Sequence, residues 1–488
     1  MREDESVVGL VDPCRVAVDV AYGKLILSCW DEGWSRSWRV VSGQFAAKGL
    51  TLDCTRRIGI DRCLLHLDRG PAQPAPLRPN ANGAWIRSLV ESNLAGVRVE
   101  RVELSRDDRR KLSGQYSRLI LRTAAARNGQ AEAAIVATED KDQAVIDGAL
   151  AAGLIWADAL RMSGQVINRL SLFLPRGRAS ATASRLTAIT GQTLAVRLYE
   201  IDETERSIEL LSPYDQGDLA DNLKKAADGL VWPEDMPSTP ETDRIVSSVV
   251  AIAPEFITAQ SKDSGISLSI RGLEFARTVT GEPKLYFGIG PDRKLLDLKA
   301  NGVIDGGSMS ELRRLVWRII SERTAHSDDR NSDIYRMQSE RWLESIVMGG
   351  ADAIDPNIDP RYMYSQVPVC KGEEKGYIDL LAATRSGRLV VIELKTAEDG
   401  DFPFQGLDYW LRARWHAERG DFQRRGYFQG LQLTDESPLV YLVAPLFRFH
   451  RSTALIASSI SERVPIYRVG INEDWRSGIK VLLRERLN

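Results

Sequence analysis

The chain has 488 residues, and its 65 Lys and Arg nearly balance its 67 Asp and Glu. This length favours two to four domains, and the balanced charge argues against a uniformly basic nucleic-acid-binding protein without excluding a local basic groove. Four histidines and five cysteines, with no CxxC pair or Cys/His cluster, argue against a structural zinc site.

The N-terminal sequence MREDESVVGL is charged and lacks the basic-then-apolar pattern of a secretory signal. The longest apolar stretch, residues 148–162, is interrupted by Asp158 and Arg161 and is too short to span a bilayer. The scattered cysteines fit a reducing compartment. The sequence therefore predicts a soluble, cytoplasmic protein with no membrane partner.

Proline-rich or polar segments divide the chain into four parts. Dense proline excludes a helix interior or a central strand at residues 71–83 and 231–243, and residues 326–333 are almost entirely polar. The predicted domains are a β-rich N-terminal domain, an α/β domain, a β-rich or α+β intermediate domain and a C-terminal α/β domain, spanning residues 1–100, 101–232, 241–326 and 330–488.

Short apolar or alternating runs predict strands in both β-rich domains, at residues 15–30, 62–68, 266–279 and 284–290. A helix is expected over residues 309–324, because Leu312, Leu315 and Ile319 recur at helical spacing.

Strands alternate with helices in the C-terminal domain. Helices are predicted at residues 334–348, 405–418 and 454–460, and strands at 377–384, 389–394, 439–445 and 465–471. This order predicts an α/β sandwich around a mixed sheet.

The stretch GYIDLLAATRSGRLVVIELK carries the chemistry. Glu393 and Lys395 share one face of a strand because side chains alternate, and a hairpin turn at Gly387 can bring Asp379 beside them. Two carboxylates and an ammonium on one sheet face are costly unless they have a function. A hard divalent cation, Mg²⁺ or Mn²⁺, is the expected cofactor, because it takes carboxylate ligands and keeps waters for a phosphate substrate.

This arrangement resembles the PD-(D/E)xK nuclease superfamily, with Asp379 as the metal-binding aspartate and Glu393-Leu394-Lys395 as the ExK element. The proline that usually precedes the aspartate is replaced by Ile378. The resemblance implies a restriction-endonuclease-like αβ sandwich and a metal-dependent DNA endonuclease in repair, recombination or antiviral defence. Lys395 would position the attacking water.

Two flanking helices extend the resemblance. Gln405 and Tyr409 form a QxxxY pair similar to that of RecB-type nuclease domains, where such residues lie near the phosphate backbone. Upstream, Glu340 or Glu344 would supply the helix carboxylate that, as in Holliday-junction resolvases, reaches the metal. Arginines next to aromatic residues suit phosphate contact, which makes Arg412 and Arg414 candidate nucleic-acid ligands.

An internal repeat is predicted at an offset of 258 residues, which aligns the turn at Gly129 with that at Gly387. Leu121 then falls at Asp379, Ile135 at Glu393 and Ala137 at Lys395; further on, Tyr199 is matched with Tyr467. Residues 100–215 would thus be a degenerate nuclease-like domain without metal ligands. The competing interpretation is two unrelated units with a generic α/β pattern.

Alternative functions remain open at this level. The chain could be a nucleic-acid-binding scaffold with weak or no activity, or a nuclease acting on RNA. It has no P-loop, GxSxG or HExxH motif, which argues against a built-in NTP-driven motor and the commonest other hydrolases. Cutting both strands of DNA needs two active sites, which a homodimer would supply.

Overall fold

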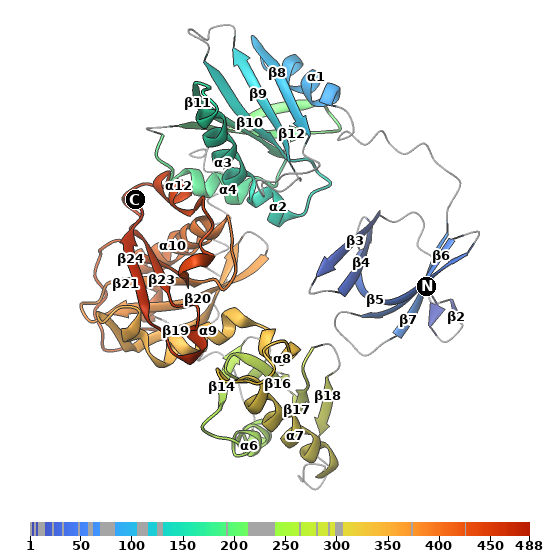
Figure 1. Cartoon of the computed structure of the whole chain (residues 1–488), viewed down its shortest axis with the longest axis vertical. Coiled ribbons are helices and arrows are strands. Elements are labelled where there is room, and N and C mark those ends of the chain that lie inside the picture. Colours follow the sequence, from blue (N-terminus) through green and yellow to red (C-terminus); the bar gives the residue numbers. More distant parts are fainter. Residues whose placement is uncertain are drawn as a thin grey trace. The chain divides into compact units, whose positions relative to one another are not determined.

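In the computed structural model (Figure 1), the chain forms two compact units, Met1–Arg78 with Met236–Arg323, and Pro79–Asp235 with Thr324–Asn488. The residues described are 2–488 except the segments 4–5, 8–14, 22–23, 32–33, 47–48, 57–61, 69–82, 105–115, 124–129, 192–193, 213–239, 263–264, 280–281, 291–292, 298–305, 372–373 and residue 425. The predicted connection at 71–83 and most of that at 231–243 lie outside the described residues. The chain is mixed α/β.

The first unit contains two antiparallel sheets. One has the strand order β2-β1-β7-β6-β5-β4-β3, from β1 (Arg2–Glu3), β2 (Ser6–Val7), β3 (Arg15–Ala21), β4 (Lys24–Asp31), β5 (Trp34–Ala46), β6 (Gly49–Arg56) and β7 (Arg62–Asp68). The other is a meander of β14 (Ile257–Lys262), β15 (Gly265–Ile270), β16 (Leu273–Val279), β17 (Glu282–Phe287) and β18 (Lys294–Asp297), accompanied by α6 (Pro240–Val250) and α7 (Gly306–Glu322). The strands and helix predicted for these β-rich parts are confirmed.

The second unit contains two mixed sheets, each formed by one section of chain. The N-terminal α/β section comprises α1 (Gly83–Asn93), β8 (Val97–Leu104), β9 (Ser117–Thr123), β10 (Ala131–Val136), α2 (Gln143–Asp147), α3 (Ala149–Met162), β11 (Ile167–Pro175), α4 (Ser180–Leu186), β12 (Ala195–Asp202) and β13 (Ser207–Leu211). The predicted boundary at residue 100 falls inside β8. The section begins earlier, because α1 buries Ile86, Leu89 and Val90 in a core shared with β8 and β9.

The C-terminal α/β section contains every secondary-structure element predicted for it. Its elements are α8 (Asp333–Arg336), α9 (Ser339–Gly349), η3 (Ala351–Ala353), β19 (Ile358–Lys371), β20 (Glu374–Thr384), β21 (Leu389–Leu394), α10 (Phe402–Glu418), α11 (Asp421–Arg424), β22 (Leu439–Pro445), η4 (Leu446–Arg448), α12 (Thr453–Ser458), β23 (Ile466–Ile471), η5 (Trp475–Ser477) and β24 (Val481–Arg486). The single helix predicted at 334–348 is two helices, since Gln338 has a left-handed φ of 47°.

The two α/β sections share one sheet topology. Their strand orders are β13-β12-β11-β10-β9-β8 and β19-β20-β21-β22-β23-β24, which are the same order read from opposite edges. In chain order, each sheet has two antiparallel pairings, two parallel pairings and a final antiparallel one. A helix precedes the first strand of each section, and α3 and α10 occupy the same connection. The predicted internal repeat is therefore supported at the level of topology.

Backbone pairing fixes which residues correspond. The Ala137 N–H donates to the Phe173 carbonyl at 3.0 Å, as the Lys395 N–H donates to the Val443 carbonyl at 3.0 Å. Ala137 therefore stands in the place of Lys395, and Ile135 in that of Glu393, as predicted.

Two of the predicted correspondences are wrong. Arg118, not Leu121, is paired with Ile135 and so occupies the place of Asp379, because the connection from β9 to β10 is longer than that from β20 to β21. Further along, Tyr199 pairs with Phe173 as Val469 pairs with Val443, so Tyr199 corresponds to Val469 and not to Tyr467.

Glycines mark equivalent points on the two long helices. A Cβ added to Gly153 of α3 would lie 2.9 Å from Leu170 Cδ1, and one added to Gly406 of α10 would lie 2.8 Å from Val440 Cγ1. At both distances a Cβ would force the facing side chain to shift, so a glycine allows each helix to lie close to its sheet. Gly153 therefore corresponds to Gly406.

The two α/β sections contact each other through a local two-fold arrangement. Ile189, after α4, forms an antiparallel bridge with Ile460, after α12. The flanking hydrogen bonds are reciprocal: Thr190 N–H donates to Ser459 and Ser461 N–H to Ala188, each at 2.8 Å. One hydrophobic core includes residues of α3, α4, α10 and α12. Such reciprocity is the geometry of a symmetric dimer interface, here within one chain.

Within the described part of the chain, no helix combines the length and apolar character that crossing a membrane requires.

Candidate active site

Asp379 and Glu393 lie side by side on adjacent strands. The antiparallel register pairs Leu380 of β20 with Ile392 of β21, so Asp379 and Glu393 are next in line. The Asp379 carboxylate is fixed by the backbone, since the Leu394 N–H donates to its Oδ2 at 2.9 Å. The apolar residues of β21 are buried in the cores on both faces of the sheet, which holds the strand rigidly.

Glu393 is nearly sealed from solvent, with 3% of its surface exposed. Its Oε1 accepts a hydrogen bond from Lys395 Nζ at 3.2 Å. Its Oε2 is buried and has no hydrogen-bond partner among the described residues. A buried carboxylate oxygen without a partner is energetically costly, so it marks a place where a positively charged ligand would be favourable.

The helix α9 adds Glu344 to this group through a bridging amide. Gln366 Nε2 donates to Glu344 Oε2 at 2.8 Å and to Asp379 Oδ1 at 3.1 Å. Arg341 and Ser365 also donate to the Glu344 carboxylate. Glu344 is therefore held one hydrogen-bonded step from Asp379.

Glu340, one turn earlier on α9, lies on the Lys395 side of the site. Its carboxylate accepts a hydrogen bond from the backbone of Thr396 and is close enough to Lys395 and Asp379 for their charges to act on it. Ser339 and Thr396 are hydrogen-bonded through their hydroxyls at 2.6 Å, which attaches the start of α9 to the end of β21. Both candidate glutamates therefore border the site.

The crowding of carboxylates shows in their protonation. Burial, reinforced by the charge of Asp379, raises the pKa of Glu393 well above its ordinary value, and burial also raises the pKa of Asp379. Burial raises the pKa of Glu344 to about 7. Burial opposes the charge on Lys395, but the surrounding carboxylates outweigh it and raise the pKa of Lys395. The site thus gathers more carboxyl groups than its two cations, Lys395 and Arg341, can balance, and the raised pKa values favour protons on these groups.

The predicted QxxxY pair lies on α10. Burial, followed by the charges of Glu393 and Asp379, raises the pKa of Tyr409, so its phenol lies within the electrostatic field of the carboxylate pair. Gln405 donates to Asp399 Oδ2 at 2.9 Å and is partly buried. Tyr409 belongs to the site, whereas Gln405 is engaged with the loop that enters α10.

The two predicted nucleic-acid arginines differ in their surroundings. Arg412 donates to the Asp408 backbone carbonyl at 2.7 Å and is bound to its own helix. Arg414 forms an exposed ion pair with Glu418 at 2.6 Å and lies over the Trp410 ring. These contacts of both arginines are made to residues of α10 itself.

Sequence reasoning missed Gln366, Ser365 and Arg341. The available signal was weak: a Ser-Gln pair interrupts the otherwise apolar run of β19. The backbone of Gln366 has a φ of 53°, an unfavourable conformation for a residue other than glycine. Strain of this kind concentrates at functional sites, where the surrounding contacts stabilise it.

The equivalent place in the N-terminal α/β section is closed by its own residues. Arg118 forms an ion pair with Glu103, 3.7 Å between Nη2 and Oε2, and Glu103 stands opposite it on β8. The Arg118 guanidinium also lies 4.9 Å from the centre of the Trp156 ring, and Trp156 corresponds to Tyr409 by the glycine alignment. A built-in cation therefore replaces the carboxylate pair.

The residues of the C-terminal site fit a hard divalent cation. Across the part of the chain that the structure describes, no group of three or more His, Cys, Asp or Glu side chains is arranged to hold a metal ion. A Mg²⁺-type site needs less, since such ions are held by one or two carboxylates and keep several waters. Asp379 and the unpartnered Oε2 of Glu393 supply that minimum.

No protein-family model matches the chain, and no curated protein shows significant sequence similarity to it. The functional assignment therefore rests on the geometry of the site.

Proposed function

We propose that the C-terminal α/β section is a metal-dependent nuclease of the PD-(D/E)xK kind, which hydrolyses phosphodiester bonds of DNA with Mg²⁺ or Mn²⁺. The observation that carries the proposal is the buried, unpartnered Glu393 Oε2 beside Asp379, with Lys395 on the same strand. The order helix, two hairpin strands, ExK strand and Tyr-bearing helix supports the restriction-endonuclease-like sandwich that the sequence resemblance implies.

Asp379 and Glu393 would hold the cation, with Glu344 or Glu340 reaching it directly or through water. The bound cation would neutralise charge on the scissile phosphate and activate a water molecule. The raised pKa of Lys395 keeps it charged at neutral pH. Lys395 is therefore suited to orient the attacking water and to stabilise the negative charge that develops on phosphorus oxygens, rather than to accept a proton.

Residues of α10 would bind the nucleic-acid strand. The Tyr409 phenol, next to the carboxylates, can donate to a phosphate oxygen, and Gln405 and the exposed guanidinium of Arg414 would contact the backbone further away. Attack of water on phosphorus in line with the leaving oxygen would leave a 5′-phosphate and a 3′-hydroxyl. The chain would act in DNA repair, recombination or antiviral defence, and RNA is the alternative substrate.

Incubation of the purified chain with plasmid, linear and single-stranded DNA, and with RNA, tests the proposal. Cleavage should require Mg²⁺ or Mn²⁺, stop with EDTA and disappear in Asp379→Asn and Lys395→Met. Equal cleavage by these variants and the unmodified chain would refute the assignment, and the RNA arm decides between the two substrate classes.

A further inference from the structure

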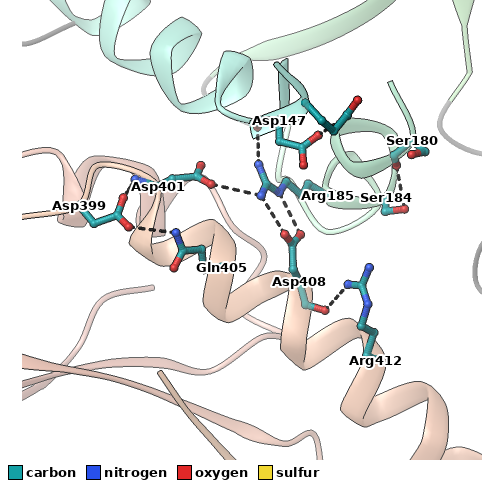
Figure 2. Close-up of polar contacts among 10 residues, drawn as sticks. Asp147, Ser180, Ser184, Arg185, Asp399, Asp401, Gln405, Asp408 and Arg412 are labelled. Atoms are coloured by element: carbon teal, nitrogen blue, oxygen red, sulfur yellow. Dashed lines mark hydrogen bonds and ion pairs between the residues drawn. The ribbon is translucent and has the colours of Figure 1, made fainter. Parts of the chain in front are cut away.

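A fully buried arginine joins the two α/β sections of the second unit. Arg185, on α4, has 0% of its surface exposed. Its Nε and Nη2 donate to Asp408 Oδ1 and Oδ2 at 2.9 and 2.8 Å, and Nη2 also reaches Asp401 Oδ2 at 3.3 Å (Figure 2). Nη1 donates to the Asp147 carbonyl of its own section. Each of the three guanidinium nitrogens thus donates a hydrogen bond, and the two parallel bonds to Asp408 fix the direction of the contact as well as its distance.

The aspartates that Arg185 holds lie on the element that faces the candidate active site. Asp401 is the residue immediately before α10, and Asp408 lies two turns further, directly before Tyr409. Between them, Gln405 is tied to Asp399, whose Oδ1 also accepts from the Asp401 N–H at 2.8 Å (Figure 2). One arginine therefore fixes the first two turns of α10.

The same segment also touches Lys395. The Lys395 ammonium lies 6.0 Å from the centre of the Phe402 ring at the start of α10, and the Arg185 guanidinium lies 5.1 Å from the centre of the Phe404 ring. A shift of this end of α10 would therefore change both the position of Tyr409 and the packing beside Lys395.

The symmetry-related place contains no such ion pair. By the Gly153–Gly406 correspondence, Asp408 is matched by Ile155, and by the Ile189–Ile460 bridge Arg185 is matched by Ile456. Ile456 belongs to the shared hydrophobic core, and the partly buried Ile155 packs against that core. Apolar packing thus suffices to hold the interface on one side, so the buried ion pair on the other side is not needed for adhesion alone.

We propose that Arg185 is a positioning residue, through which the section without metal ligands orients α10, and with it Tyr409 and Gln405, toward the catalytic carboxylates. This inference rests on the proposed nuclease function for its kinetic consequences. It assigns a role to the inert section: it completes the active site of its neighbour rather than binding a substrate of its own.

The test replaces the ion pair by apolar residues in the full chain. Arg185→Met alone removes the cation that neutralises the buried Asp408 and can fail to fold. The decisive variant is therefore the double substitution Arg185→Met with Asp408→Leu, which imitates the apolar residues on the other side. Arg185→Lys keeps the charge without the fork. Ile155→Val, at the symmetry-related place, is the matched control.

Two readouts are measured on each variant with a melting temperature close to that of the unmodified chain. The double variant should lose about 10- to 100-fold in kcat/KM, with kcat lowered and KM raised, because Tyr409 and Gln405 would no longer hold the phosphate backbone in line with the carboxylates. Its hydrogen–deuterium exchange should be faster in residues 402–410. Arg185→Lys should recover part of both, and Ile155→Val should change neither.

The two readouts separate this inference from the proposed function. If the unmodified chain cleaves no nucleic acid, the nuclease assignment fails and the exchange of residues 402–410 alone decides the positioning role. A stable double variant with unchanged exchange, or with unchanged kcat/KM where the unmodified chain is active, would overturn the inference.

Discussion

The two α/β sections have the same strand order, but different residues stand at the positions of the candidate active site. Where the C-terminal section has Asp379, Glu393 and Lys395, the N-terminal one has Arg118, Ile135 and Ala137. Both sections keep apolar residues where the helices pack on the sheet. The fold therefore does not depend on Asp379, Glu393 and Lys395. In the N-terminal section the Glu103 carboxylate is shared by Arg118 and Arg101, whereas the carboxylates of the C-terminal site outnumber its two cations, Lys395 and Arg341. An added cation would therefore be favourable only in the C-terminal section.

The largest effect is expected from substituting the charged residues of the candidate active site. Asp379→Asn, Glu393→Gln and Lys395→Met should each lower the cleavage rate by about 10²-fold or more. The first two substitutions each remove a charged ligand of the cation, and the third removes the positive charge that faces the reacting phosphate. Arg118→Met, at the matched position, should leave cleavage within about two-fold. A loss of activity in Arg118→Met without a loss of folding would mean that the N-terminal section takes part in the chemistry.

One active site per chain should show in the products. A nuclease that acts through the single carboxylate pair of Asp379 and Glu393 would cut one strand for each binding event. Supercoiled plasmid should therefore first become open circles, and linear DNA should appear only later. Gel electrophoresis over a time course, at several protein concentrations, measures this order. Linear DNA as the first product, at a rate that rises with the square of protein concentration, would instead indicate a dimer with two sites.

Metal-free stability should fall as the pH rises. Between the ordinary glutamate pKa and the raised pKa of about 7, Glu344 is protonated in the folded state and ionised in the unfolded state. The contribution of this proton to the unfolding free energy is therefore complete below this pH range and is lost as the pH rises through it. Glu344→Gln should therefore raise the unfolding free energy at pH 8 by about 2 kcal/mol. Urea titrations at pH 5 and pH 8 check this, with Glu103→Gln as the matched variant that should show no gain.

The smallest effect is expected at Arg414. Its exposed pair with Glu418 already satisfies much of its charge, so Arg414→Gln should weaken DNA binding only a few-fold and lower the slope of log affinity against log salt by about one. Fluorescence anisotropy on the Asp379→Asn background separates binding from cleavage. Arg122→Gln, an exposed arginine paired with Glu100 in the other section, is the control and should change neither quantity.

The sequence was most informative where a pattern has a fixed period. Alternation along β21 placed Glu393 and Lys395 on one face, and the hairpin spacing brought Asp379 beside them. The residue that corresponds to Asp379 could not be predicted from the sequence. The β9–β10 connection is longer than the β20–β21 connection, so the offset of 258 residues holds for β10 but not for β9. A constant offset therefore matched Leu121, and not Arg118, with Asp379.

Contacts between residues far apart in the sequence could not be predicted from the sequence. Arg185 and Asp408 are 223 residues apart, and nothing in the local sequence of either helix distinguishes them from surface charges. Gln366 joins Glu344 to Asp379 only because its backbone adopts a left-handed conformation within β19. Such a conformation is decided by tertiary packing and not by the residue's own preference.

We propose that the C-terminal α/β section has a metal site and that the N-terminal one has none. Calorimetric titration of the metal-free full chain with Mn²⁺ measures this difference. Binding should be accompanied by proton release at pH 7, since the raised pKa values of the carboxylates fall when a cation is bound. It should be lost in Asp379→Asn and in Glu393→Gln, and remain unchanged in Glu103→Gln. Binding that survives both substitutions in the C-terminal section, or that is lost in Glu103→Gln, would contradict the assignment of the metal site to Asp379 and Glu393.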